Sequence, residues 1–210
     1  MDLLTLATAL VAGFAHAIAP DHVAAVTTFV SRRPRAREAA GFGLRWGMGH
    51  SAAILVLGSV LIALDLRVSG RLAAGLEFGV GAMLLCLGLW LLWSVVHEQA
   101  HRVAGNAAPA RPHSHATAWV GVAHGLAGTA PLVAALAATT SGSAGAAVAY
   151  LLLFGVGTTA AMALYALAAG LLFGRAGRRG PRVAGALRAA TALGSAAIGV
   201  VWMLNAAAAA

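Results

Sequence analysis

The chain has 210 residues, of which 60% are hydrophobic and only 10% are charged, whereas about 25% of the residues in an ordinary soluble domain are charged. A soluble fold could not cover its surface with so few charges, and the mean hydropathy of +0.85 predicts an all-α integral membrane protein. The formal charge of +8 does not indicate nucleic-acid binding, because the basic residues are all arginines and most lie in short segments between apolar stretches.

Six transmembrane helices are predicted, and the arginines give their orientation. The expected spans are 3–30, 41–63, 73–95, 117–139, 145–173 and 183–205, because a spanning helix needs about 20 mostly apolar residues. The connections after the first, third and fifth spans contain most of the arginines. The positive-inside rule therefore places these connections in the cytoplasm and both termini outside. The expected location is a bacterial cytoplasmic (inner) membrane, which the chain crosses several times.

Two stretches of the sequence recur at one fixed offset. Residues 13–16 (GFAH) match 121–124 (GVAH), and residues 46–53 (WGMGHSAA) match 154–161 (FGVGTTAA). Both offsets are 108 residues, the difference between positions 16 and 124. Each repeat holds three spans, so the second must lie inverted relative to the first, as in many secondary transporters. We therefore expect a first transmembrane repeat at 1–95, a cytoplasmic histidine-containing loop at 96–116, a second repeat at 117–205 and a tail at 206–210.

The first span carries the strongest chemical signal, because ionisable residues lie inside an apolar stretch. His16, Asp21 and His22 would be scattered around a regular helix, which turns by about 100° per residue. Pro20 cannot bond the carbonyl of His16, however, and predicts a helix break at this point. Buried ionisable groups mark ion paths, and imidazole with carboxylate suits a divalent first-row metal. The alternative is a kinked helix whose polar groups pair with each other.

The second span adds His50, at a depth similar to that of His22. We expect His50 to be a further metal ligand, with a satisfied packing histidine as the alternative. In the third span, Glu77 is either an acidic step on the outer approach or a carboxylate that reaches the interface or pairs with Arg71 or Arg67.

The loop at 96–116 contains four histidines that are candidates for weak metal capture: His97, His101, His113 and His115. His97 and His101 are spaced to share one face of a helix. A solvated linker explains the same composition equally well.

The second repeat keeps one imidazole of the first. His124 is the repeat partner of His16, and Thr158 stands where the first repeat has His50. His124, Thr158 and Ser51 are therefore candidates for the ion pathway, and a helix–helix hydrogen bond is the alternative for His124. No nucleotide-binding motif is present.

These motifs resemble those of the nickel/cobalt transporter superfamily. The pattern His16-x4-Asp21-His22 in one transmembrane helix and Gly49–Ser51 in the next are similar to its two motifs. The six-span layout looks most like the compact branch that includes NicO and UreH. The resemblance implies movement of Ni²⁺ or Co²⁺ across the cytoplasmic membrane, in support of urease, hydrogenase or cobalamin synthesis. It also implies that the first three ionisable residues and His50 form the metal site.

We therefore expect a transporter rather than an enzyme, with Ni²⁺ or Co²⁺ as its substrate and no fixed cofactor. The expected partners are the lipid bilayer, the metal ion and metallochaperone or urease-maturation proteins, but not nucleic acid. Three alternatives stay open: an accessory membrane subunit for metalloenzyme maturation, an exporter of another solute and a membrane-embedded metalloenzyme.

Overall fold

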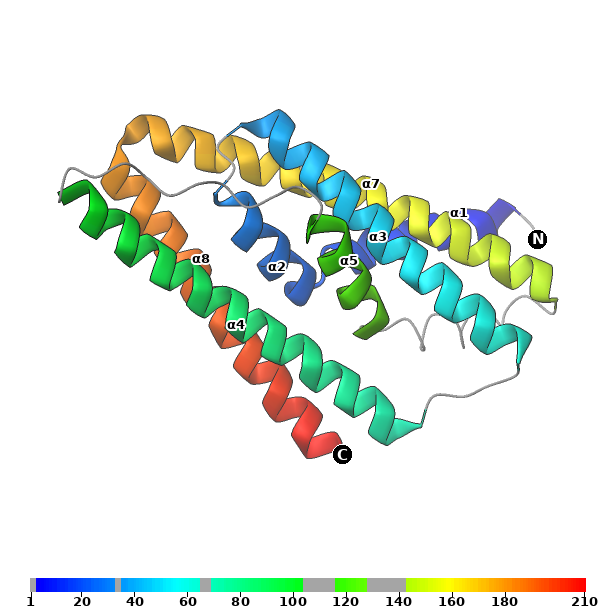
Figure 1. The fold of residues 1–210 in the computed structure, drawn as a ribbon. Helices are drawn as coiled ribbons and strands as arrows, with labels where there is room; N and C mark the ends of the chain where they lie inside the picture. Colours follow the sequence, from blue (N-terminus) through cyan, green and yellow to red (C-terminus); the bar gives the residue numbers. More distant parts are fainter. Residues whose placement is uncertain (1–2, 33–34, 65–68, 104–115, 128–142) are drawn as a thin grey trace.

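The computed structural model describes residues 3–32, 35–64, 69–103, 116–127 and 143–210, with only the backbone described at 99–103, 116–120 and 127. All regular structure in these ranges is helical, which confirms the all-α prediction. The helices, labelled in Figure 1, are α1 (Leu3–Ala17), α2 (Pro20–Val30), α3 (Ala36–Ala63), α4 (Gly70–Val103), α5 (Ala116–Ala127), α7 (Ala144–Arg179) and α8 (Pro181–Ala209).

Four of the described helices, α3, α4, α7 and α8, are individually long and apolar enough to cross a membrane. α1 and α2 meet the same criterion only as a pair, bent by 58° at the break between them, which fits either a broken span or a re-entrant loop. These helices correspond to five of the six predicted spans. The remaining predicted span, 117–139, begins within α5 and continues outside the described residues. Many large apolar side chains on the helices face outward, as lipid-facing positions require.

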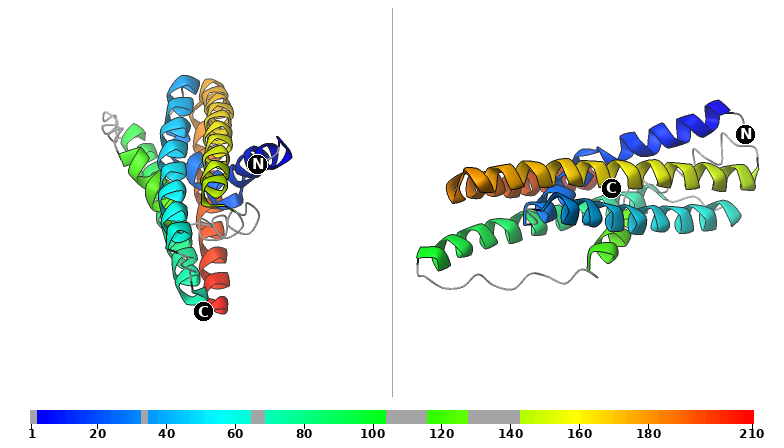
Figure 2. Two further views of the ribbon diagram at one scale, coloured as in Figure 1. Left: turned by 90° about the vertical axis from the view of Figure 1, so that its right-hand side faces the viewer. Right: turned by 90° about the horizontal axis from the view of Figure 1, so that it is seen from above.

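Two pairs of long helices form the body of the molecule. α3 lies along α7, and α4 lies along α8, while the shorter α2 and α5 lie between the two pairs in the view of Figure 1. α1 packs on α7, and α5 packs on α3. Figure 2 shows that α1 diverges from the other helices towards its N-terminal end.

Two apolar clusters of buried side chains lie along α3. One cluster contains Phe42 and Trp46, and the other contains Ile54 and Leu151. His50 lies between Trp46 and Ile54 on α3 and is also fully buried. A polar layer is therefore held between two apolar layers, where water has little access.

The polar connection expected at 174–182 is almost entirely helical. α7 continues to Arg179, and α8 begins at Pro181, so that Gly180 alone separates them. Gly180 has a φ of 128°, a conformation that glycine adopts at little cost. Arginine is a good helix former, which explains why the arginine-rich stretch extends α7. With 36 residues, α7 is about 54 Å long, and it can therefore extend beyond a hydrocarbon layer of about 30 Å.

Two other helices, α4 and α8, also extend beyond the ends predicted for their spans. α4 runs to Val103, so the first part of the loop expected at 96–116 is helical. α8 runs to Ala209, so most of the tail expected at 206–210 belongs to its last turn. The tail is a run of alanines, which have the highest helix propensity of all residues.

Candidate metal centre

The break between α1 and α2 brings together the ionisable residues of the first span. α1 ends at Ala17, and α2 begins at Pro20, a residue that is favoured at the first position of a helix. The amide of Ala19 donates to the carbonyl of His16 at 3.1 Å. The break predicted from Pro20 is present, but the carbonyl that Pro20 cannot bond is satisfied by a tighter turn. The bend lets His16 approach His22, whose ring centroid is 4.5 Å away.

Three imidazoles converge beside this break, and we call them the three-imidazole group. Nε2 of His50 lies 3.2 Å from Nε2 of His16 and 3.3 Å from Nε2 of His22. His22 and His50 are buried, whereas His16 is half-buried. A neutral imidazole has one N–H and one bare nitrogen, so the Nε2 atoms can direct lone pairs towards one cation. The spacing of the three side chains fits a metal-binding group.

Asp21 connects two further imidazole nitrogens. Its Oδ1 lies 3.0 Å from Nδ1 of His22, and its Oδ2 lies 3.1 Å from Nε2 of His124. All three side chains are buried. Asp21, His22 and His124 form a second set with metal-binding spacing, which we call the Asp21 group. Because His22 belongs to both groups, the five residues form one continuous cluster.

His124 reaches Asp21 because α5 packs closely against α3. A Cβ atom added to Gly121 would lie 2.5 Å from the carbonyl oxygen of Trp46, and one added to Gly125 would lie 2.6 Å from that of His50. Both distances are shorter than van der Waals contact. Larger residues at these two glycines would therefore move α5, and the imidazole that it carries, away from the cluster.

The sequence is similar to that of a known protein almost from end to end. The urease accessory protein UreH of Bacillus sp. (strain TB-90) is 30% identical to it over 222 residues, and the match covers 98% of this chain and 93% of UreH. This chain belongs to the UreH family. The family expected from the motifs, the compact UreH-like branch of the nickel/cobalt transporter superfamily, is thereby confirmed. No family model and no solved structure matches the chain.

Ser51 and Thr158 of this UreH-family chain lie near the cluster, but their hydroxyl groups contact backbone carbonyls. Oγ of Ser51 donates to the carbonyl of Gly155 at 3.0 Å and lies 3.1 Å from Oγ1 of Thr159. The buried hydroxyl of Thr158 lies 3.0 Å from the carbonyl oxygen of Gly13 and 2.9 Å from that of Phe154 in its own helix, and it can donate its proton to either. A pathway role for Ser51 and Thr158 stays a prediction. The sequence does not single out Thr159, although it is the repeat partner of Ser51.

Glu77 lies away from the cluster. Its side chain is exposed on α4, and it belongs to neither donor group. Among the described residues no ion pair joins it to Arg71, and Arg67 lies outside them. A role for Glu77 on the outer approach therefore stays a prediction.

The four loop histidines are only partly described. His97 is exposed near the end of α4, and its Nδ1 lies 3.2 Å from the carbonyl oxygen of Trp93. His101 lies four residues later on the same helix, but its side chain is not described, and His113 and His115 lie outside the described residues. Metal capture by this segment stays a prediction.

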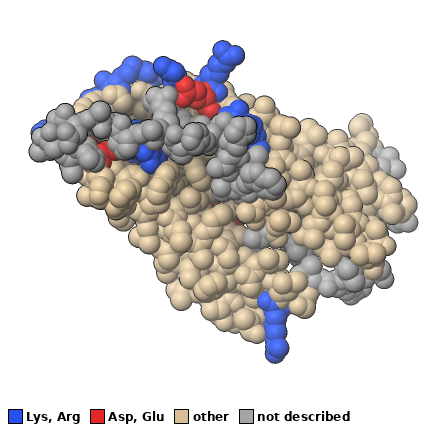
Figure 3. Space-filling model, viewed as in Figure 1, with Lys and Arg blue, Asp and Glu red and all other residues tan. Residues whose placement is uncertain are grey.

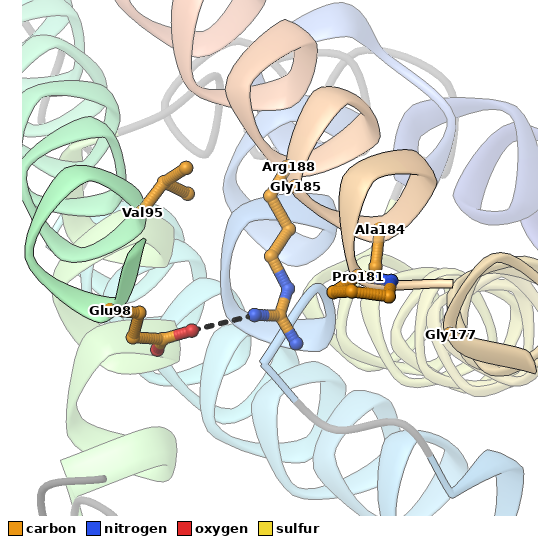
Figure 4. Close-up of a pocket in the computed structure, with 7 residues that line it drawn as sticks. All are labelled: Val95, Glu98, Gly177, Pro181, Ala184, Gly185 and Arg188. Carbon is orange, nitrogen blue, oxygen red and sulfur yellow. Dashed lines mark hydrogen bonds and ion pairs between the residues drawn. The ribbon is translucent and has the colours of Figure 1, made fainter. Parts of the chain in front are cut away.

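A separate charged cluster ties the far end of α2 to α4 and α8, and we call it the Glu98 cluster. Oε1 of Glu98 lies 3.4 Å from Nη2 of Arg32, and Oε2 lies 2.9 Å from Nη1 of Arg188. Nε of Arg188 donates to the carbonyl of Ser31 at 3.0 Å. A cavity of about 270 Å³ lies beside this cluster. Figure 4 shows the residues that line it: Val95, Glu98, Gly177, Pro181, Ala184, Gly185 and Arg188. None of these residues belongs to the two donor groups.

Proposed function

We propose that this UreH-family chain moves a divalent transition-metal ion, Ni²⁺ or Co²⁺, across the cytoplasmic membrane through its His/Asp cluster. The observation that carries the proposal is the convergence of two donor groups at a helix break inside an apolar bundle. Buried ionisable groups in spanning helices are costly and mark ion paths. A donor set of imidazoles with one carboxylate suits divalent first-row metals.

We further propose that the chain consists of two inverted repeats. Gly13 packs on Phe154, and Gly121 packs on Trp46. Gly121 follows Gly13 by 108 residues, and Phe154 follows Trp46 by the same 108 residues. Each contact therefore becomes the other when the two repeats are exchanged. Exchanged contacts of this kind are expected when two repeats are related by a two-fold axis.

The ring contacts around the metal-binding cluster follow the same exchange. The rings of His16 and Phe154 lie 5.2 Å apart, and those of His124 and Trp46 lie 5.9 Å apart. Each repeat thus contributes one histidine and one aromatic ring to equivalent contacts. This relation supports a cluster that lies at the interface of the repeats, where the sites of secondary transporters are found.

Residues separated by the repeat offset also touch each other. Ser51 lies 3.1 Å from Thr159, and a Cβ atom added to Gly88 would lie 2.6 Å from the amide nitrogen of Ala196. A residue can contact its own repeat partner only near the two-fold axis. We infer that the axis passes between α3 and α7 and between α4 and α8, and that the ion crosses as the two halves rock about it.

The arginines give the proposed orientation in the membrane. Figure 3 shows basic side chains gathered at the end of the molecule where α3 begins and α4 and α7 end, while a basic side chain also protrudes at the opposite end. The richer end would face the cytoplasm. We therefore place the chain in a bacterial inner membrane with both termini outside.

The name of the matched relative, a urease accessory protein, suggests where the metal goes. We propose that the transported ion is nickel in the first place and that it supplies the maturation of a nickel enzyme. The loop histidines His97, His101, His113 and His115 would face the cytoplasm in this orientation. There they would receive the ion before a metallochaperone or maturation partner takes it.

A flux measurement with radioactive nickel in liposomes tests the proposed function. We expect saturable ⁶³Ni²⁺ uptake by the purified full chain and a fall of at least about tenfold in Asp21→Asn, because groups that orient metal ligands contribute about 10–100-fold to metal affinity. Glu38→Gln is the matched control, since Glu38 pairs with Arg35 at the surface. Wild-type protein without flux would refute the function, and equal flux in wild type and Asp21→Asn would refute the site.

A further inference from the structure

The two ring nitrogens of His22 face different partners. Nε2 lies 3.3 Å from Nε2 of His50, in the three-imidazole group. Nδ1 lies 3.0 Å from Oδ1 of Asp21, in the Asp21 group. The ring of His22 is almost completely buried, so solvent is not the partner of either nitrogen. His22 is the one donor residue that the two groups share.

The two groups differ in their donors and in their place in the fold. The three-imidazole group offers three nitrogens and is built by α1, α2 and α3, all from the first half of the chain. The Asp21 group offers a carboxylate and two imidazoles, and it takes His124 from α5 in the second half. Among the five residues, His16 is half-buried while the other four are buried. The three-imidazole group therefore lies closer to the surface.

A neutral imidazole binds a metal through one nitrogen while the other nitrogen carries its proton. An ion in the three-imidazole group would therefore place the proton of His22 on Nδ1, which lies 3.0 Å from Oδ1 of Asp21. A carboxylate that orients a metal-bound histidine in this way is a common arrangement. An ion in the Asp21 group would instead be bound by Asp21, His124 and Nδ1 of His22. Nε2 of His22 would then not contact the metal.

We propose that the cluster is not one binding site but two overlapping ion positions that share His22 and exclude each other. A divalent cation enters the three-imidazole group at His16. It then passes across the ring of His22 to Asp21 and His124. The inference rests on the proposed function, because it takes the divalent ion as the transported substrate. The transfer changes the tautomer of His22: the N–H bond at Nδ1 breaks as the ion arrives there, and an N–H bond forms at Nε2 as the ion leaves it, so that the ring keeps one proton and stays neutral.

Equilibrium binding of Co²⁺ to the purified full chain in detergent tests the two positions. We expect one Co²⁺ per chain in the wild type, because the positions exclude each other. His16→Gln should retain one Co²⁺ in the Asp21 group, and His124→Gln should retain one in the three-imidazole group, each with an affinity within about tenfold of the wild type. His22→Gln removes the shared donor and should weaken binding by about a hundredfold, at the upper end of the range for metal-site residues. Thr8→Ala, on an exposed face of α1, is the control.

X-ray absorption of the bound Co²⁺ gives an independent measurement. We expect stronger outer-shell scattering from imidazole rings in His124→Gln, where three rings would bind the ion, than in His16→Gln, where two rings and a carboxylate would bind it. Two ions per wild-type chain, or a loss of binding in His16→Gln and His124→Gln as large as in His22→Gln, would overturn the two-position inference while leaving a metal transporter in place. A wild-type chain that binds neither Co²⁺ nor Ni²⁺ and carries no flux would overturn the proposed function itself, and the inference with it.

Discussion

Asp21 combines a structural and an electrostatic role in the cluster. It lies in the first turn of α2, where the partial positive charge of a helix N-terminus favours a carboxylate. Each of its two oxygens contacts a different imidazole, on His22 and on His124. It therefore connects the two halves of the chain through a single side chain. Loss of Asp21 should disturb both donor groups, which is why it is the first residue to substitute.

Thr158 allows a structural role to be separated from a role on the ion path. Its hydroxyl can donate to the carbonyl of Gly13 across the α1–α7 contact as well as to that of Phe154 within α7. We expect Thr158→Val to lower the free energy of unfolding in detergent by about 0.6–1.7 kcal/mol, the range measured for hydrogen bonds between membrane helices. If Thr158 has this structural role, nickel affinity should stay within about twofold of the wild type, because its hydroxyl contacts backbone carbonyls.

Thr191→Val is the matched control for this prediction. The hydroxyl of Thr191 donates to the carbonyl of Leu187 in its own helix, so its loss should change stability by less than about 0.5 kcal/mol. Titration with SDS, followed by circular dichroism, measures both variants. A nickel affinity that falls more than tenfold in Thr158→Val would place this threonine on the ion path instead.

The four proposed metal ligands of the first repeat could be found from the sequence, because ionisable residues are conspicuous in an apolar span and Pro20 predicts where the helix breaks. The contact between His124 and Asp21 could not be found in this way. It depends on how closely α5 approaches α3, which Gly121 allows, and a hydropathy pattern contains no such distance. The repeat offset relates His124 to His16 but does not say which side chain it touches.

At the scale of whole elements, α2 is held at both ends. Its N-terminal turn carries Asp21 and His22, which contact the other imidazoles, and its C-terminal end is fixed through the Glu98 cluster. With 11 residues, α2 is about 16 Å long, too short to bend much along its length. A movement that displaces the ligands must therefore also displace the end that Arg188 holds at Ser31.

Removal of the charge of Glu98 tests this anchoring. Glu98→Gln should lower the free energy of unfolding by about 1.5–3 kcal/mol, the range for hydrogen bonds to charged groups, because it leaves Arg32 and Arg188 without their acid. Glu38→Gln is the matched control. Glu38 is in contact with Arg35, which is 74% exposed, and an exposed pair of this kind contributes about 0–1 kcal/mol. Equal effects of the two substitutions in a chemical unfolding assay would contradict the anchoring role.

The elements themselves were largely predictable, and their ends were not. Apolar stretches of sufficient length identify α3, α4, α7 and α8 as membrane helices. Hydropathy treats arginine and glutamate as signs of a loop, although both are good helix formers. The stretches that contain Glu98 and Arg175–Arg179 therefore continue their helices instead of ending them. Ion pairs of Glu98 with α8 and with the residues after α2 add a tertiary reason that no local pattern contains.

At the scale of the whole molecule, glycines set the spacing of the long helices. A Cβ atom on Gly47 would lie 2.8 Å from Cα of Thr159, and one on Gly199 would lie 2.5 Å from the amide nitrogen of Leu85. Lipid supplies little hydrophobic driving force between helices, so close packing of small residues holds them together. The α3–α7 and α4–α8 contacts are both of this type, and each runs between the two halves of the sequence. The halves therefore form one body by packing against each other.

The single carboxylate of the cluster has a consequence for the electrical work of transport. With neutral imidazoles and an ionised Asp21, the empty cluster carries a charge of about −1, and the cluster loaded with a divalent ion carries about +1. A membrane potential acts on each charge with about 2.3 kcal/mol per 100 mV for a complete crossing. An inside-negative potential draws the loaded cluster inward and pushes the empty one back outward. Under the proposed function, the same voltage would drive both halves of an uptake cycle.

A potassium diffusion potential imposed on the liposomes tests this consequence. An inside-negative potential should accelerate ⁶³Ni²⁺ uptake, and an inside-positive one should slow it. Uptake that does not respond to voltage would mean that each form of the cluster is electrically balanced by charges outside it.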